Sequence, residues 1–131
     1  MKIKLLNGRE SYWTNKGIDW NAPSRSKLQT GCKLVLMQHW ITDKVGEEVR
    51  VPGNKLYFDF VNFSKKIIVE VDGKQHRKFT PFFHKNNIHQ FVGSMKRDDT
   101  KQRFADINEW MMLRVQNQTE LQKYLAYGGI S

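Results

Sequence analysis

Two short hydrophobic segments that contain acidic residues constrain the fold of this chain more than any other feature. The segment 56–62 reads LYFDFVN, with Asp59 at its centre, and the segment 67–72 reads IIVEVD, with Glu70 and Asp72. Their aromatic and β-branched residues predict two β-strands joined by a turn at residues 63–66. Because a charged side chain is rarely buried unless it is paired or binds a metal, these acids indicate either a salt bridge or a metal site.

The rest of the chain predicts a single α/β domain. A length of 131 residues suits one domain with a hydrophobic core. Apolar residues at helical spacing and β-branched runs, bounded by turn residues, mark the expected elements. They are a helix from Ser24 or Ser26 to about Trp40, strands at 47–52, 56–62, 67–72 and 110–115, and helices at about 96–108 and 118–127.

The order of these elements predicts the sheet. Three consecutive strands indicate a meander, with the strand 67–72 near the centre of the sheet. The helix at 96–108, with Phe104, Ile107 and Met111 on its inner face, forms a crossover that lets the fourth strand lie parallel to the third. We therefore expect a central four-stranded mixed sheet flanked by helices, in the order helix-strand-strand-strand-helix-strand. Residues 1–23 form an N-terminal arm, residues 24–115 the core, and residues 116–131 a C-terminal helix.

The charge of the chain favours a polyanionic partner. The 22 Lys and Arg residues outnumber the 13 Asp and Glu residues, which gives a net charge of +9. The basic residues are scattered along the chain and are not confined to one amphipathic helix, which favours nucleic acid over an anionic membrane. Solubility alone is the plainer explanation of the charge.

Other classes of protein are disfavoured by what the sequence lacks. No apolar run approaches the length of a membrane span, and the first residues lack the hydrophobic stretch of a signal peptide. Cys32 is the only cysteine, which excludes an internal disulfide and a multi-cysteine zinc site. We therefore expect a cytoplasmic protein.

Strand geometry suggests how the acids meet. Side chains alternate between the two faces of a strand. Asp59 is therefore expected on one face of its strand and Phe58 and Phe60 on the other, while Glu70 and Asp72 share one face of the next strand. If the two strands pair, Asp59 can lie beside Glu70. Two neighbouring carboxylates repel each other unless a cation intervenes, and Mg²⁺, or Mn²⁺ in its place, prefers such oxygen ligands. A salt bridge to one of the many basic residues is the alternative.

Six short segments in a fixed order resemble the motifs of a known family. The resemblance is to the PD-(D/E)XK nuclease superfamily, and more narrowly to the branch related to very short patch repair endonucleases, which includes phage-borne homing endonucleases. It covers about residues 24–115. The segments are SRSKLQ at 24–29, EEVRVPG at 47–53, FDF at 58–60, EVDGKQH at 70–76, FFH at 82–84 and KRDDTK at 96–101.

The resemblance implies a metal-dependent endonuclease that hydrolyses phosphodiester bonds of double-stranded DNA. By resemblance, Asp59 and Glu70 would be the ligands of Mg²⁺. His76 would lie near the scissile phosphate as a general acid, general base or phosphate contact, and Asp98 would open the later helix and orient the site. Gln29 occupies a position that is often Glu in relatives and would shape the site.

The second acid departs from the family pattern. Asp72 stands where the lysine of the (D/E)-x-K triplet is usual, counted from Glu70, whereas counting from Asp72 restores a literal D-x-K that ends at Lys74. Both acids share a face, so alternation cannot choose between the two registers. The interior position of Glu70 and the Gln-His pair that follows favour Glu70. Lys74 or Gln75 would assist proton transfer or charge neutralisation.

Basic residues of the long segment after the third strand are candidates for DNA contact. They supply affinity for phosphate, while most of the phenylalanines there are expected to anchor the segment to the core. Lys101 either pairs with Asp98 or faces the phosphate. The N-terminal arm is a further candidate for DNA contact through Lys2, Lys4, Arg9, Trp13 and Lys16. Zinc bound by His84 and His89 is a weaker alternative. The predicted DNA contacts are Arg77, Lys78, His84, Lys85, Lys96, Arg97 and Lys101.

Several functions remain open on this fold. The favoured one is a site-specific homing-type nuclease, which would act in the host cytoplasm if a phage encodes it. The enzymatic alternatives are a mismatch-nicking repair nuclease and a junction-resolving nuclease, the latter acting as a homodimer. A DNA-binding module without catalysis is the rival from another class, and it would not be expected to keep acids that cost affinity for DNA.

Overall fold

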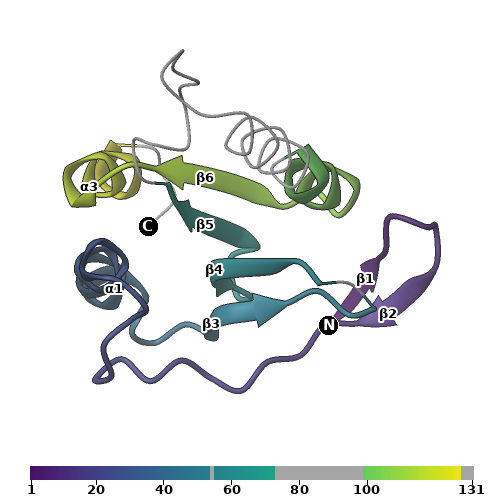
Figure 1. Ribbon diagram of the computed structural model, residues 1–131, viewed down its shortest axis with the longest axis horizontal. Helices are drawn as coiled ribbons and strands as arrows, with labels where there is room; N and C mark the ends of the chain where they lie inside the picture. Colours follow the sequence, from purple (N-terminus) through teal and green to yellow (C-terminus); the bar gives the residue numbers. More distant parts are fainter. Residues whose placement is uncertain (54, 73–98, 128–131) are drawn as a thin grey trace, which may run out of the picture.

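The computed structural model describes residues 1–53, 55–72 and 99–127 (Figure 1). The described chain alternates short strands with three helical segments, and one of these helices is described only over residues 99–107. The other elements are β1 (Lys2–Lys4), β2 (Glu10–Tyr12), α1 (Lys27–Trp40), β3 (Val45–Arg50), β4 (Tyr57–Asn62), β5 (Ile67–Val71), β6 (Met111–Val115) and α3 (Gln118–Tyr127).

The predicted four-stranded mixed sheet is confirmed, with strand order β3-β4-β5-β6. The first three strands form an antiparallel meander, in which Val61 of β4 faces Gly46 of β3 and Ile68 of β5. The fourth strand, β6, lies parallel to β5, with Ile68 opposite Met112. The helix at 99–107 lies between β5 and β6 in the chain, so it is part of the crossover connection that the sequence predicted.

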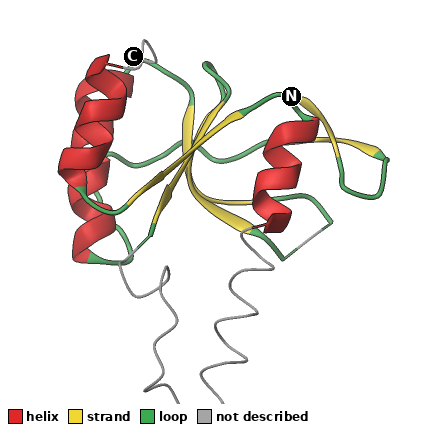
Figure 2. Ribbon diagram, turned by 90° about the horizontal axis from the view of Figure 1, so that it is seen from above, coloured by secondary structure: helices red, strands yellow, loops and turns green. Residues whose placement is uncertain are grey.

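Helices cover both faces of this sheet (Figure 2). On one face, α1 and α3 pack side by side. The helix at 99–107 lies on the other face, next to the hairpin formed by β1 and β2. The sequence did not predict this hairpin. The side chain of Asn108 ties it to the end of the helix, because its amide accepts from the Lys4 N–H and donates to the Lys4 carbonyl.

Local signals explain the position and packing of α1. Ser26 is the residue before the helix, and its hydroxyl accepts a hydrogen bond from the Gln29 N–H, as an N-cap does. Gly31 is unfavourable in a helix interior on propensity alone. Here a Cβ at Gly31 would meet the side chain of Gln118, so the glycine lets α3 approach α1 closely.

Two hydrophobic clusters fill the space between the sheet and its two covering layers. The helix-pair cluster lies under α1 and α3 and contains Cys32, Val35, Leu36, Trp40, Val45, Phe60, Ile67, Val69, Leu113, Val115, Leu121 and Leu125. The Trp13 cluster lies on the other face and contains Ile3, Trp13, Val49, Val51, Leu56, Phe58, Val61, Phe63, Ile68, Phe104, Ala105 and Trp110.

The expectation that Phe58 and Phe60 share a face is wrong. Phe58 belongs to the Trp13 cluster, whereas Phe60 belongs to the helix-pair cluster. The same exchange of faces occurs in β3, between Val45 and Val49. Between them Glu48 adopts a left-handed backbone with φ of 54°, which breaks the regular alternation of an extended strand. The outer strand β3 thus departs from regular strand geometry at Glu48, next to Asp59 of β4.

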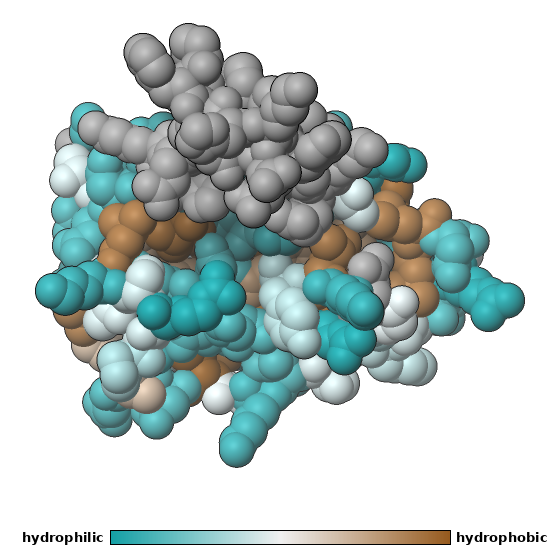
Figure 3. Space-filling view, in the orientation of Figure 1, coloured by the Kyte–Doolittle hydropathy of each residue, from teal (hydrophilic) through white to brown (hydrophobic). Residues whose placement is uncertain are grey.

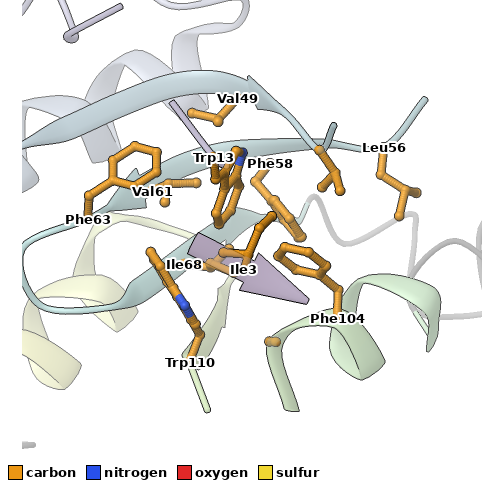
Figure 4. Packing of buried hydrophobic residues seen from close by; sticks show 12 residues of the cluster. Ile3, Trp13, Val49, Leu56, Phe58, Val61, Phe63, Ile68, Phe104 and Trp110 are labelled. Atoms are coloured by element: carbon orange, nitrogen blue, oxygen red, sulfur yellow. The ribbon is translucent and has the colours of Figure 1, made fainter. Parts of the chain in front are cut away.

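Trp13 is the centre of the second cluster (Figure 4). Its ring lies 5.2 Å from the rings of both Phe104 and Trp110 and 5.8 Å from that of Phe58, in edge-on or tilted arrangements that aromatic pairs prefer. Its indole Nε1 donates to the carbonyl of Arg50 at 3.0 Å. A buried side chain with these contacts cannot serve as the DNA contact that the sequence suggested for the arm.

The predicted inner face of the later helix is partly wrong. Phe104 is buried as expected, but Ile107 and Met111 are exposed, and Ala105 is buried instead. The reason is that the helix ends before Met111, where Glu109 adopts a left-handed backbone with φ of 59°. Met111 therefore belongs to β6 and does not continue the helical spacing.

The visible surface is mainly hydrophilic, with separate hydrophobic patches (Figure 3). Within the ranges that the structure describes, no helix combines the length and the apolar character that crossing a membrane requires.

Replacing Trp13 by alanine should destabilise the fold by about 3–5 kcal/mol, because the change empties the centre of a packed aromatic cluster. Urea denaturation followed by circular dichroism measures the change in the free energy of unfolding. The neighbouring Tyr12 is exposed, so Tyr12→Ala should change that free energy by less than about 0.5 kcal/mol. Equal losses for both variants would contradict the central position of Trp13.

Candidate metal site

Asp59 and Glu70 lie where the pairing of β4 and β5 stops. The last paired residues are Phe60 and Val69. Continuing this register by one step would place Asp59 opposite Glu70, so the two acids occupy adjacent strands at the same level. The structure therefore brings together the two residues that alternation along the strands had suggested as neighbours.

The two carboxylates link β4 and β5 just beyond the last paired residues. The N–H of Asp59 donates to Glu70 Oε2 at 2.9 Å, and the N–H of Val71 donates to Asp59 Oδ2 at 2.8 Å. Each acid is thus fixed by the backbone of the opposite strand. Backbone N–H groups hold carboxylates in a defined orientation and stabilise their charge. The pair is consequently positioned by the sheet itself, before any ligand binds.

Lys101 supplies a positive charge to this pair. Its Nζ forms an ion pair with Glu70 Oε1, and the two side chains are only 18% and 4% exposed. The same ammonium lies 5.8 Å from the ring centre of Phe58, within reach of a cation–π interaction. The helix at 99–107 therefore contributes a residue to the site, although Lys101 lies 31 residues from Glu70 in sequence.

Burial raises the pKa of the Asp59 carboxyl from 3.8 to about 8. The negative charge of Glu70 adds to this effect, while the Val71 N–H and the charge of Lys101 oppose it. One local cation thus does not fully compensate two neighbouring carboxylates. A divalent ion between them would relieve the repulsion and displace the proton of Asp59.

Cys32 of α1 is a further ionisable residue on which the charge of Asp59 acts. The thiol is completely buried, and its burial, together with the charge of Asp59, raises its pKa to about 11. Such a thiol is neutral at physiological pH and is therefore a poor metal ligand and nucleophile.

Asp72 has a different environment from Glu70. Its carboxylate lies 3.9 Å from the guanidinium of Arg114 on β6, and its N–H donates to the carbonyl of Val115. Asp72 is thus attached to β6, while Glu70 contacts β4 beside Asp59. Of the two registers that the sequence left open, the geometry favours Glu70 as the partner of Asp59.

Gln29 takes part in a polar network next to the acid pair. Its side-chain Nε2 donates to Glu47 at 3.1 Å and to Glu48 at 3.3 Å. Glu47 also forms an ion pair with Lys33 at 2.8 Å and accepts a hydrogen bond from the Ser24 hydroxyl. The sequence predicted a role for Gln29 in shaping the site, but it did not predict this network.

Lys33 is the most buried charge of the network. Its side chain is 2% exposed, and its ammonium also donates to the carbonyl of Ala22 at 2.7 Å. It therefore attaches the segment before α1 to the helix and to β3. The only sequence signal for this role was a lysine among the apolar positions of a helix, opposite a strand that carries two consecutive glutamates.

Glu48 connects the network with the acid pair. In the register of β3 and β4 it would face Asp59, but its left-handed backbone interrupts the pairing there. Its carboxylate is held by Gln29 and lies 3.6 Å from Arg25. Both Glu48 and Asp59 line a pocket of about 200 Å³, whose other charged lining residues are Arg25, Lys55 and Lys101. The pocket is thus lined by two acidic and three basic residues.

The donor set fits a divalent ion held by two protein ligands. Among residues 1–53, 55–72 and 99–127, no group of three or more His, Cys, Asp and Glu side chains could hold a metal. Mg²⁺, however, is commonly bound by one or two carboxylates together with waters and substrate phosphate oxygens. Asp59 and Glu70 would hold the ion, and an open pocket would leave room for water and phosphate.

The other predicted site residues lie outside the described residues. They include the four remaining catalytic candidates, which follow the third strand, and most of the basic residues expected to contact DNA. These residues are Lys74, Gln75, His76, Arg77, Lys78, His84, Lys85, Lys96, Arg97 and Asp98.

Removing the Lys33 ammonium should destabilise the protein. Lys33→Met leaves the Glu47 carboxylate without its ion pair in a largely buried position, which typically costs about 3–5 kcal/mol. Chemical denaturation measures the loss, and Glu47→Gln added to Lys33→Met should recover part of it. Lys27→Met, on the exposed face of the same helix, is the matched control and should stay within about 0.5 kcal/mol of wild type.

The raised pKa of Asp59 should make the metal-free protein less stable as pH rises. Between the ordinary pKa and about 8, the folded protein keeps a proton that the unfolded chain has lost. The free energy of unfolding should therefore fall by up to about 1.4 kcal/mol per pH unit from this group. Urea denaturation in the presence of a chelator, between about pH 5 and about pH 8, measures the slope.

Asp59→Asn should remove this contribution to the slope, whereas Asp106→Asn, at an exposed helical position, should retain it. A slope that is the same in Asp59→Asn as in wild type would show that another group is responsible.

Comparison with known proteins does not assign the chain to a family. No family model, no curated protein and no solved structure matches it. The function therefore has to be inferred from the side chains that the fold brings together.

Proposed function

We propose that this protein is a metal-dependent endonuclease that hydrolyses phosphodiester bonds in double-stranded DNA. The observation that carries the proposal is the pair formed by Asp59 and Glu70. Each carboxylate is fixed by a backbone N–H of the opposite strand, at the point where the two strands cease to pair. Such an arrangement holds two oxygen ligands in a fixed orientation beside the pocket that Asp59 lines.

The charges around this pair support a phosphate as the second partner of the cation. The pocket beside Asp59 is lined by Arg25, Lys55 and Lys101, and the whole chain carries a net charge of +9. Basic residues attract the DNA backbone and supply most of the non-specific affinity for it. Two carboxylates inside a basic surface would repel DNA unless a cation joined them to a phosphate.

Each residue of the proposed site would have a separate role in phosphodiester hydrolysis. Asp59 and Glu70 would hold the ion, and the N–H groups of Asp59 and Val71 keep both carboxylates in place. A divalent ion at such a site lowers the pKa of a bound water and stabilises negative charge on the phosphate. Arg25 and Lys101 would orient the phosphate by charge. In the same proposal, His76 would transfer a proton, with Lys74 or Gln75 assisting.

The preferred biological role is a site-specific, homing-type nuclease, and it rests on the resemblance of the motifs. Mismatch nicking and junction resolution are alternatives that use the same chemistry. One observation favours a DNA-binding module without catalysis, because Lys101 neutralises the charge of Glu70. The catalytic candidates all need a metal for cleavage, whereas the non-catalytic module binds DNA without cleaving it.

Cleavage of supercoiled plasmid in the presence of Mg²⁺ or Mn²⁺ tests the proposal. Wild type should nick or linearise the plasmid, and Asp59→Asn and Glu70→Gln should each slow cleavage about 100-fold or more, since a metal supplies several kcal/mol of transition-state stabilisation. Asp106→Asn removes an exposed acid of the helix that carries Lys101 and should cleave like wild type. Chelation should abolish all cleavage.

Fluorescence anisotropy with labelled duplexes separates binding from cleavage. Both site variants should bind DNA at least as tightly as wild type, because neither substitution adds a negative charge near the phosphate. DNA binding by wild type without cleavage of plasmid, mismatched duplex or four-way junction would favour the non-catalytic module. Full cleavage by both site variants would reject the assignment of Asp59 and Glu70.

A further inference from the structure

We propose that Lys101 is a built-in counter-ion of the acid pair, which a divalent metal must displace from Glu70 in order to bind. The inference rests on the proposed metal site and goes beyond it, because it assigns to a lysine of another element the control of metal affinity. In the structure the Lys101 ammonium is paired with Glu70 Oε1.

The two oxygens of Glu70 have separate partners. Oε2 accepts the N–H of Asp59 and so belongs to the connection between the strands, while Oε1 accepts from Lys101. A metal that also contacts Asp59 needs a free position on Glu70, and the ammonium occupies the oxygen that the backbone leaves available. The metal and the ammonium therefore compete for one carboxylate oxygen.

Lys101 has the properties of a displaceable cation. Lysine carries its charge at the end of a flexible chain and forms no fixed bidentate pair with a carboxylate. Its side chain is 18% exposed and lines the pocket beside Asp59, so the ammonium has space to move into. A divalent ion and an ammonium that contact the same carboxylate repel each other, so binding of the metal weakens the contact between Lys101 and Glu70. By the same coupling, the contact between Lys101 and Glu70 weakens binding of the metal.

A purely structural salt bridge predicts a different result. If Lys101 only stabilised the fold, its removal would lower stability and leave metal affinity equal or weaker. If Lys101 competes with the metal, its removal lowers the stability of the metal-free protein and at the same time raises metal affinity. The sign of the change in affinity thus separates the two roles.

Calorimetric titration with Mn²⁺ in the absence of DNA measures this sign on the full chain. Lys101→Met should bind Mn²⁺ about tenfold more tightly than wild type, since a hydrogen bond to a charged group is worth about 1.5–3 kcal/mol and 1.4 kcal/mol is tenfold. Saturating Mn²⁺ should also raise the melting temperature of the variant more than that of wild type. Lys123→Met removes an exposed lysine of α3 and should leave both values unchanged.

Lys101→Arg provides a second test with the opposite sign, and it keeps the fold if Lys101→Met does not. A guanidinium pairs with carboxylates more firmly than an ammonium, so this variant should bind Mn²⁺ more weakly than wild type. Equal or weaker affinity in folded Lys101→Met, or tighter affinity in Lys101→Arg, would overturn the inference while leaving the metal site intact. Absence of Mn²⁺ binding in wild type and in both variants would overturn the metal site, and the inference with it.

Discussion

The exchange of hydrogen bonds between the backbone of one strand and the acid of the other is the interaction on which the site depends. The N–H groups of Asp59 and Val71 lie beyond the last residues that pair between β4 and β5. They donate to the carboxylates of Glu70 and Asp59, so both acids are oriented at the point where strand pairing ends. The same exchange confines two negative charges, which makes a cation necessary nearby. Lys101 supplies it from the crossover helix.

The hydrophobic core stabilises this irregular edge from both faces of the sheet. Phe58 and Phe60, which flank Asp59, are anchored in different clusters, so neither side chain can rotate without losing its packing. The left-handed backbone at Glu48 allows the neighbouring strand to follow the same twist. The network of Gln29, Glu47 and Lys33 then connects this strand to α1. Packed side chains therefore surround the region in which the pairing of β4 with both of its neighbouring strands is interrupted.

The sequence predicted those features that depend on local pattern, including the order of the core elements, the meander, the parallel fourth strand and the proximity of Asp59 to Glu70. It failed where one element determines the conformation of another. The separation of Phe58 from Phe60 accompanies a left-handed backbone in the neighbouring strand β3, and the burial of Trp13 depends on a hairpin without a clear local signal. The contact of Lys101 with Glu70 depends on how the crossover helix lies on the sheet. In each case the cause lies in residues that are distant in the chain.

The buried thiol of Cys32 also has a practical meaning. It is the only sulfhydryl group of the chain, it lies in α1 within the helix-pair cluster, and its burial and high pKa make it unreactive while that layer is closed. Its alkylation therefore requires α1 to separate from the sheet, and the rate of alkylation measures how often this separation occurs. The native chain thus contains a natural probe for the opening of the layer formed by α1 and α3, and no label has to be introduced to measure it.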